Sequence, residues 1–158
     1  MNSRLAVLRR CTLVLLCLPM LAMARGAQAS QDSLYARMGG EAVVRAVVSD
    51  TLDRVVADHR LGRSFAEVDV ERIKRLLVEQ ICELAGGGCR YSGDSMREVH
   101  GGHEISEAEF YGLVEMLRDS LRRHHVRQRE RNELLALLAP MERDVVNVPA
   151  PRSSLAQP

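Results

Sequence analysis

The chain has 158 residues and a mass of 17.6 kDa, which is enough for one domain with tails. Apolar residues make up 46%, which excludes a wholly disordered protein, and a formal net charge of +1 gives no global basic field for nucleic acid. The chain has no Trp, two Phe and three Tyr, so its composition argues against an all-β sandwich and favours an all-α fold.

The N-terminal 29 residues have the pattern of a secretory signal peptide. Three arginines precede an apolar run over residues 11–24, and Ala27-Gln28-Ala29 supplies the small residues that a signal peptidase recognises. A membrane anchor is the alternative, but a run of 14 residues is shorter than the roughly 20 that a spanning helix needs. We therefore expect cleavage before Ser30, no membrane span afterwards, and an exported, periplasmic protein.

Cleavage would change both the charge and the cysteine content. Four arginines and no acid are lost, which leaves 18 basic and 21 acidic side chains and a net charge of −3. Cys82 and Cys89 remain, in an oxidising compartment where thiols can pair. They flank a segment that ends in three glycines, where a helix would stop and the chain could turn back. We predict a disulfide between them, with two free buried thiols as the alternative.

The domain expected over residues 30–147 reads as helices separated by glycines. Apolar side chains recur three and four positions apart, and no alternating strand pattern is present. The expected elements are a helical turn over 32–37, helices over 41–57 and 69–85, a short helix over 95–100, a helix that a Ser106–Glu109 capping box opens, and a last helix through 134–145. Pro140 should kink this last helix. Residues 148–158 are rich in Pro, Ser and Ala and are expected to be a disordered tail.

His100 differs from the other four histidines in its setting. It follows Met96 and Val99 and precedes a glycine pair, so it ends a short, half-apolar helix that would face the core. Taken alone, this pattern favours a buried, hydrogen-bonded histidine. His103 is nearby, but no Cys, Asp or Glu completes a four-ligand zinc site there.

Eight short motifs follow one another along residues 34–146. They are Gly39-Gly40, Arg54-Val55-Val56-Ala57-Asp58, Leu61 with Phe65, Gly86-Gly87, Tyr91-Ser92-Gly93, Met96-Arg97-Glu98-Val99-His100, Ile105-Ser106 and Leu138-Ala139-Pro140. Each is weak alone. In this order and spacing, the chain resembles the group I truncated haemoglobins over nearly the whole expected domain.

The resemblance implies a truncated globin-like fold, a two-over-two helical sandwich around a non-covalent haem b. His100 matches the proximal histidine that ligates the iron, and Phe65 matches the aromatic side chain that stacks on the porphyrin. Lys74, and after it Arg75, are the candidates for pairing with a haem propionate, with a solvated charge as the alternative for both. The apolar side chains expected to line the haem site are those of Ile73, Leu77, Met96, Val99, Ile105, Phe110, Leu113 and Leu117.

The distal side of the expected haem site departs from the family's pattern. Many members place a Tyr on the second helix and a Gln or His on the third, whereas the matching positions here are Leu52, Ile73 and Leu77. Thr51 is the only nearby hydroxyl, and Gln80 lies one turn further on. Bound dioxygen would then lack a charge-assisted hydrogen bond worth about 1.5–3 kcal/mol. Carbon monoxide and nitric oxide depend less on such a bond.

These observations leave three functions open. A haem protein that binds diatomic gases (dioxygen, nitric oxide and carbon monoxide) is the first. The alternative is a haem-dependent redox enzyme that detoxifies nitric oxide or peroxide, which would need polar distal groups and an electron donor or reductase. A helical interaction module without haem is the third, and the presence of both His100 and Phe65 argues against it. We expect no nucleic-acid partner.

Overall fold

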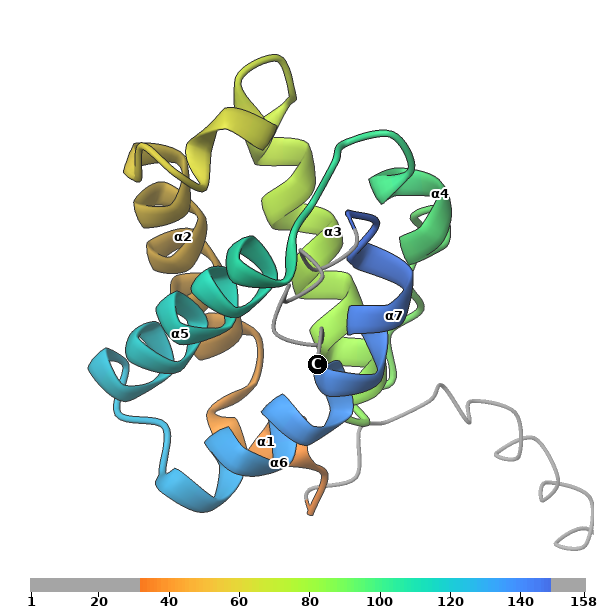
Figure 1. Cartoon of the computed structure of the whole chain (residues 1–158). Coiled ribbons are helices and arrows are strands. Elements are labelled where there is room, and N and C mark those ends of the chain that lie inside the picture. Colours follow the sequence, from red (N-terminus) through yellow and green to blue (C-terminus); the bar gives the residue numbers. More distant parts are fainter. Residues whose placement is uncertain (1–31, 149–158) are drawn as a thin grey trace, which may run out of the picture.

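The computed structural model describes residues 32–148, and every regular element in that range is helical (Figure 1). In chain order the elements are α1 (Leu34–Met38), α2 (Gly40–Ala57), the 3-10 helix η1 (Gly62–Phe65), α3 (Val70–Leu84), α4 (Met96–His100), α5 (Glu107–Arg123), α6 (Gln128–Leu138), the 3-10 helix η2 (Ala139–Met141) and α7 (Glu142–Val145). The expected all-α fold is confirmed. The signal peptide expected over residues 1–29 and nearly all of the tail expected over 148–158 lie outside the described residues.

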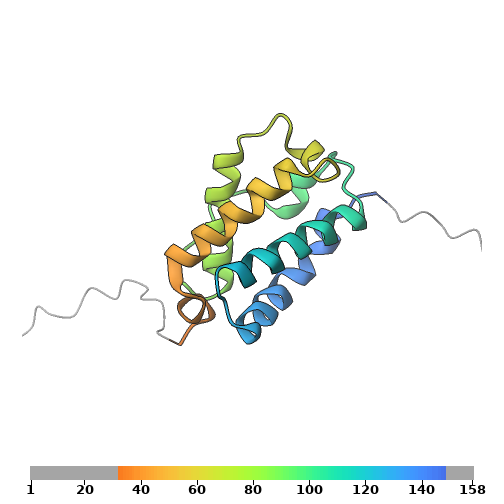
Figure 2. The same ribbon diagram turned by 90° about the vertical axis from the view of Figure 1, so that its left-hand side faces the viewer.

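Two pairs of helices form the body of the domain. α2 packs against both α3 and α5, and α5 packs against α6 and α7. Figure 2 shows α2 and α5 crossing the molecule side by side, with α3 flanking α2 and the α6–α7 segment flanking α5. This is the two-over-two sandwich that the sequence leads us to expect. Between residues 32 and 148, no helix is both long and apolar enough to cross a bilayer.

α2 lies at the centre of the core because its apolar stripe is buried along the whole helix. The buried side chains are Val44, Val47, Val48, Thr51, Leu52 and Val55. Thr51 is the one polar member, and its Oγ1 donates to the Val47 carbonyl at 2.7 Å. This bond satisfies the hydroxyl where water cannot reach it.

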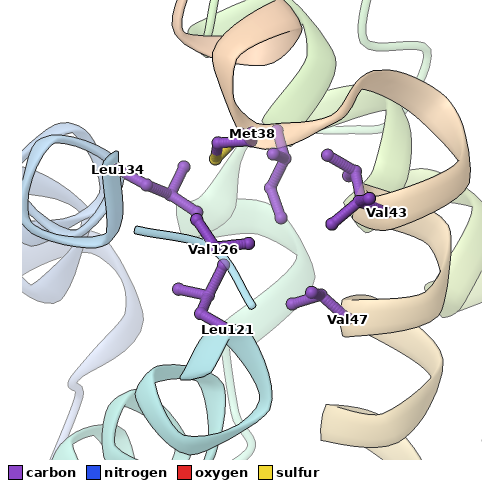
Figure 3. A pocket seen from close by; sticks show the side chains of 8 residues that line it. Met38, Val43, Val47, Leu121, Val126 and Leu134 are labelled. Atoms are coloured by element: carbon purple, nitrogen blue, oxygen red, sulfur yellow. The ribbon is translucent and has the colours of Figure 1, made fainter. Parts of the chain in front are cut away.

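The end of the core near α1 contains a small apolar cavity of ≈ 10 Å³. Figure 3 shows the side chains that surround it, among them those of Met38, Val43, Val47, Leu121, Val126 and Leu134. A cavity of this size holds at most about one water molecule, and this lining offers no hydrogen-bond partner. This end of the molecule is therefore packed core.

Side-chain caps set where four of the described helices begin, and that of α1 is Ser33, whose hydroxyl accepts from the Ala36 amide at 3.1 Å. The Asp69 carboxylate accepts from the Arg72 amide at 3.0 Å and opens α3, and the Ser106–Glu109 capping box opens α5, both as expected. A second capping box, in which Ser95 and Glu98 cap each other's backbone, opens α4. The short helix that carries His100 thus has a fixed start.

Pro140 interrupts the last helical segment, as its sequence position indicates. α6 ends at Leu138, a 3-10 turn follows over Ala139–Met141, and α7 begins at Glu142. Proline lacks the N–H that would continue the hydrogen-bond ladder, so the helix cannot run straight through. Beyond this break, α7 packs against α4 (Figure 1).

Candidate functional site

His100 is the last residue of α4, and its imidazole is half-buried. Its Nδ1 lies 2.7 Å from the carbonyl oxygen of Met96, one helical turn earlier. A carbonyl can only accept, so Nδ1 carries the proton and Nε2 keeps a free lone pair. Burial lowers the pKa of His100, which favours the neutral ring, and the bond to Met96 opposes this shift. A neutral imidazole with a free Nε2 is a metal ligand with its tautomer already fixed.

The apolar side chains expected to line a haem site share a feature that sets them apart from the α2 stripe. They come from several elements, and they are half-buried rather than buried. They are Phe65, Ile73, Leu77, Met96, Ile105, Phe110 and Leu113. Half-buried apolar surface on η1, α3, α4 and α5 is what a flat, apolar cofactor could cover, so these residues fit a haem.

Two residues expected to line the site are not in this half-buried set. Val99 is 38% exposed, although it lies next to His100 on α4. Leu117 is 3% exposed and belongs to the packed core with the α2 stripe. The reason is their place on each helix: Val99 is on the solvent side of α4, and Leu117 is on the side of α5 that packs into the core.

The polar groups near the expected distal side are already engaged. Leu52, expected on the distal side, is 1% exposed and belongs to the same packed core as Leu117, and the Thr51 hydroxyl beside it is bonded to α2's own backbone. The Gln80 amide donates to the Met96 sulfur at 3.3 Å, which links α3 to α4. The Thr51 hydroxyl therefore has no free donor for a bound ligand, whereas one of the two amide hydrogens of Gln80 has no partner among the described residues.

The two cations considered for a propionate are both paired with carboxylates. The Lys74 amine lies 2.7 Å from Asp53 on α2 and 2.7 Å from Glu71 on its own helix. The hydrogen bond to Asp53 is the main reason that the pKa of Lys74 is raised. Arg75 pairs with Glu79 at 3.4 Å. A propionate would have to share or displace these partners.

The segment between α3 and α4 is tied back to α3. Cys82, which is fully buried, and Cys89, which is exposed, form a disulfide with a Cα–Cα distance of 5.7 Å. The Glu79 carboxylate accepts from the Ser92 hydroxyl at 2.6 Å and from its amide at 3.2 Å. The hydroxyl bond is the main cause of the lowered pKa of Glu79. These links hold the chain that leads from α3 to the helix of His100.

Sequence reasoning missed the contacts that hold α4 from its other side. Arg97 forms an ion pair with Asp144 on α7, and the Asn147 amide donates to the His100 carbonyl. The partners lie 47 positions apart in both cases. Arg97, Asp144 and Asn147 belong to no periodic pattern, so no signal in the sequence could have found these pairs.

The fold, with a half-buried histidine at the end of a short helix, defines the class of the protein as a two-over-two globin. A family model described as bacterial-like globin matches residues 33–147. The chain belongs to this family. Membership implies haem as the cofactor, and the half-buried apolar side chains on several elements are compatible with it.

The chain is similar to individual truncated haemoglobins. The chain is 31% identical over 123 residues to a group 1 truncated haemoglobin, GlbN, of Mycolicibacterium paratuberculosis, over 78% of this chain and 90% of that one. The Fe(III) crystal structure of the truncated haemoglobin from Tetrahymena pyriformis matches with a TM-score of 0.70 and 25% identity, over 73% and 98% of the two chains. The 2/2 haemoglobin of Synechococcus sp. PCC 7002, solved in the cyanomet state with covalently attached haem, matches with a TM-score of 0.68 and 28% identity over the same shares.

Proposed function

We propose that this protein holds a non-covalent haem b through His100 and binds diatomic gases, namely dioxygen, nitric oxide and carbon monoxide. The observation that carries the proposal is the imidazole of His100, which is half-buried at the end of a short helix and bonded through Nδ1 to the Met96 carbonyl. Haem, when bound, supplies an iron with a coordination position for a small ligand. The chain supplies the axial nitrogen and the apolar surroundings.

Each part of the site has a distinct task in this proposal. His100 Nε2 binds the metal, and the Met96 carbonyl keeps the ring from rotating. Phe65 stacks on the porphyrin, and the half-buried side chains of α3 and α5 keep water from its faces. A dry, apolar setting favours neutral gas molecules over charged ligands.

A non-covalent link between haem and protein is favoured by the cysteines. Cys82 and Cys89 are bonded to each other, so within residues 32–148 no thiol is free to form a thioether with the cofactor. The Synechococcus neighbour, whose haem is covalently attached, makes this worth measuring. Under denaturing conditions, mass spectrometry should find the polypeptide without the added mass of haem. A polypeptide that keeps this mass would contradict non-covalent binding.

The apolar distal side favours gases that need no hydrogen bond. Leu52, Ile73 and Leu77 offer no donor, the Thr51 hydroxyl is bonded to the backbone, and the Gln80 amide is tied to the Met96 sulfur through one of its two hydrogens. Bound dioxygen should therefore dissociate fast and autoxidise readily, whereas carbon monoxide and nitric oxide should be held well. Rapid-mixing measurements of dissociation rates for the three gases test this order.

The ligation of the iron is tested by replacing His100 with alanine. We expect His100→Ala to abolish or greatly weaken haem retention, so that the Soret band of the purified protein is lost. His103→Ala is the matched control, because His103 is exposed and only three positions away. If His103→Ala removed the Soret band and His100→Ala kept it, the assignment of the axial ligand would be wrong.

A further inference from the structure

Asn147, which follows α7, bridges two points of the chain on either side of the loop over residues 101–104. Its Nδ2 donates to the His100 carbonyl at 2.7 Å, and its Oδ1 accepts from the Ile105 amide at 2.7 Å. Its backbone amide donates to the Ile105 carbonyl at 3.0 Å, as does that of Val148 at 3.2 Å. One side chain thus fixes both the end of α4 and Ile105, which lies just before the start of α5.

α4 depends on such contacts because it is too short to be stable alone. It has five residues, fewer than half of the roughly 12–15 that make an isolated helix even marginal. The last carbonyls of a helix have no partner inside it, and at His100 that carbonyl accepts from Asn147 and from the His103 amide. Of the two donors, only Asn147 ties α4 to another part of the fold.

A second contact runs in parallel with the first. Arg97 on α4 pairs with Asp144 on α7, and both side chains border a polar pocket that Asn147 also lines. Arg97 is 79% exposed in its side chain, so this ion pair is screened by water and holds α4 only weakly. Asn147 is also exposed, but its shorter side chain bonds directly to the backbone carbonyl of His100.

We propose that Asn147 is a positioning residue for His100. By holding the His100 carbonyl, the Asn147 side chain fixes the position and the rotation of α4 relative to the rest of the domain, and therefore the position of the imidazole. This inference rests on the proposed function, because the place of the ring matters only if it binds the iron. Its structural half, that Asn147 immobilises α4, stands without any cofactor.

The test exchanges one atom of the Asn147 side chain. Asn147→Asp keeps the acceptor for the Ile105 amide but puts a second acceptor against the His100 carbonyl, and it adds a negative charge. Asn132→Asp is the matched control, because it makes the same chemical change at an exposed position on α6. Asn147→Ala, which adds no charge, is the second variant.

The first readout is amide hydrogen exchange of the purified full chain, which needs no bound cofactor. We expect exchange in α4 and the following loop to accelerate about tenfold in both Asn147 variants, as befits one lost hydrogen bond. Exchange in α2 should stay as in the wild type, and Asn132→Asp should change neither. Unchanged exchange in α4, or equal acceleration in α2, would overturn the inference, because Asn147 would then add only general stability or none.

The second readout is the iron–histidine bond in the ferrous protein. In the Asn147 variants the iron–histidine stretching band should shift or broaden, and haem should transfer to an acceptor globin about tenfold faster. Faster exchange in α4 with an unchanged stretching band would show that α4 moves without moving the ligand, which also overturns the positioning role. If the wild type itself takes up no haem, the proposed function fails, and the exchange data still decide whether Asn147 holds α4.

Discussion

Leu52 stands on α2 where many truncated haemoglobins carry a tyrosine, and one hydroxyl there should change the chemistry of the site. The Thr51 hydroxyl beside it cannot serve as a donor, since it is bonded to the backbone. Leu52→Tyr would add an O–H donor on the expected distal side. We expect dioxygen release to slow by about one to two orders of magnitude and carbon monoxide release to change much less. Stopped-flow dissociation rates measure both.

The control for this substitution is Leu52→Phe, which adds the ring without the hydroxyl. If Phe slowed dioxygen release as much as Tyr, the bulk of the ring and not a hydrogen bond would be the cause. Slow dioxygen release in the unmodified protein would contradict the apolar distal side, and it would mean that Thr51 or Gln80 turns its donor to the ligand.

Glu109 has two tasks at the start of α5. It caps the Ser106 amide at 3.0 Å and pairs with Arg63 at 2.6 Å, and the bond to Arg63 is the main reason that its pKa falls to about 2. Because its pKa is lower in the folded state, the ionised Glu109 carboxylate stabilises the protein fully above its ordinary pKa of 4.5. This stabilisation is lost as the pH falls from 4.5 toward 2.

Glu109→Gln keeps a capping amide and removes the charge. We expect it to lower the free energy of unfolding by about 1–2 kcal/mol at pH 7, less than the full pKa shift implies because Arg63 is half exposed. The difference from the wild type should shrink between pH 4.5 and pH 3 in urea titrations. Glu107→Gln, an exposed position in the same turn, should change little at either pH. A difference that stays constant with pH would contradict the ion-pair account.

Among the elements, the connection from α3 to α4 is stabilised by a covalent link. Cys82 and Cys89 are seven positions apart, so their disulfide closes a loop of about eight residues, for which chain entropy gives roughly 2–3 kcal/mol. The variant with both Cys82→Ser and Cys89→Ser should lose about this much in urea unfolding. A reductant should destabilise the wild type similarly and leave the variant unchanged. Thiol counting on the denatured, unreduced protein should find none free in the cleaved chain; two free thiols would refute the pairing.

Local patterns predicted the positions of α2, α3 and α5, but the expected start of the last helix at residue 134 was wrong, since α6 begins at Gln128, and they did not predict how α4 is held. The stripe of α2, the Asp69 cap and the Ser106–Glu109 box depend on residues a few positions apart, and such signals can be recognised without the fold. Contacts such as Asn147 with His100, or Lys74 with Asp53, depend on how helices meet. For the same reason the pattern did not predict that Val99, which is apolar and next to His100, is exposed.

At the scale of the whole molecule, we propose that residues 1–29 direct export to the periplasm and are removed. The family match begins at residue 33, after these residues. Mass spectrometry of protein from an extracytoplasmic fraction should find an N-terminus at or near Ser30. Ala29→Arg, which places a bulky charge where the peptidase requires a small residue, should leave the chain uncleaved. An intact wild-type chain in the cytosol would contradict both cleavage and export.

The contact between Asn147 and the His100 carbonyl also sets an order of events during synthesis. A ribosome makes the histidine 47 residues before the amide that holds it, an interval of about 2–10 s at ordinary rates of translation. Through that interval the chain carries the proposed iron ligand on a helix that neither α7 nor Asn147 yet supports. Capture of the cofactor should therefore follow completion of the domain, before or after export, and a purified chain truncated before residue 147 should hold haem poorly even though it contains His100.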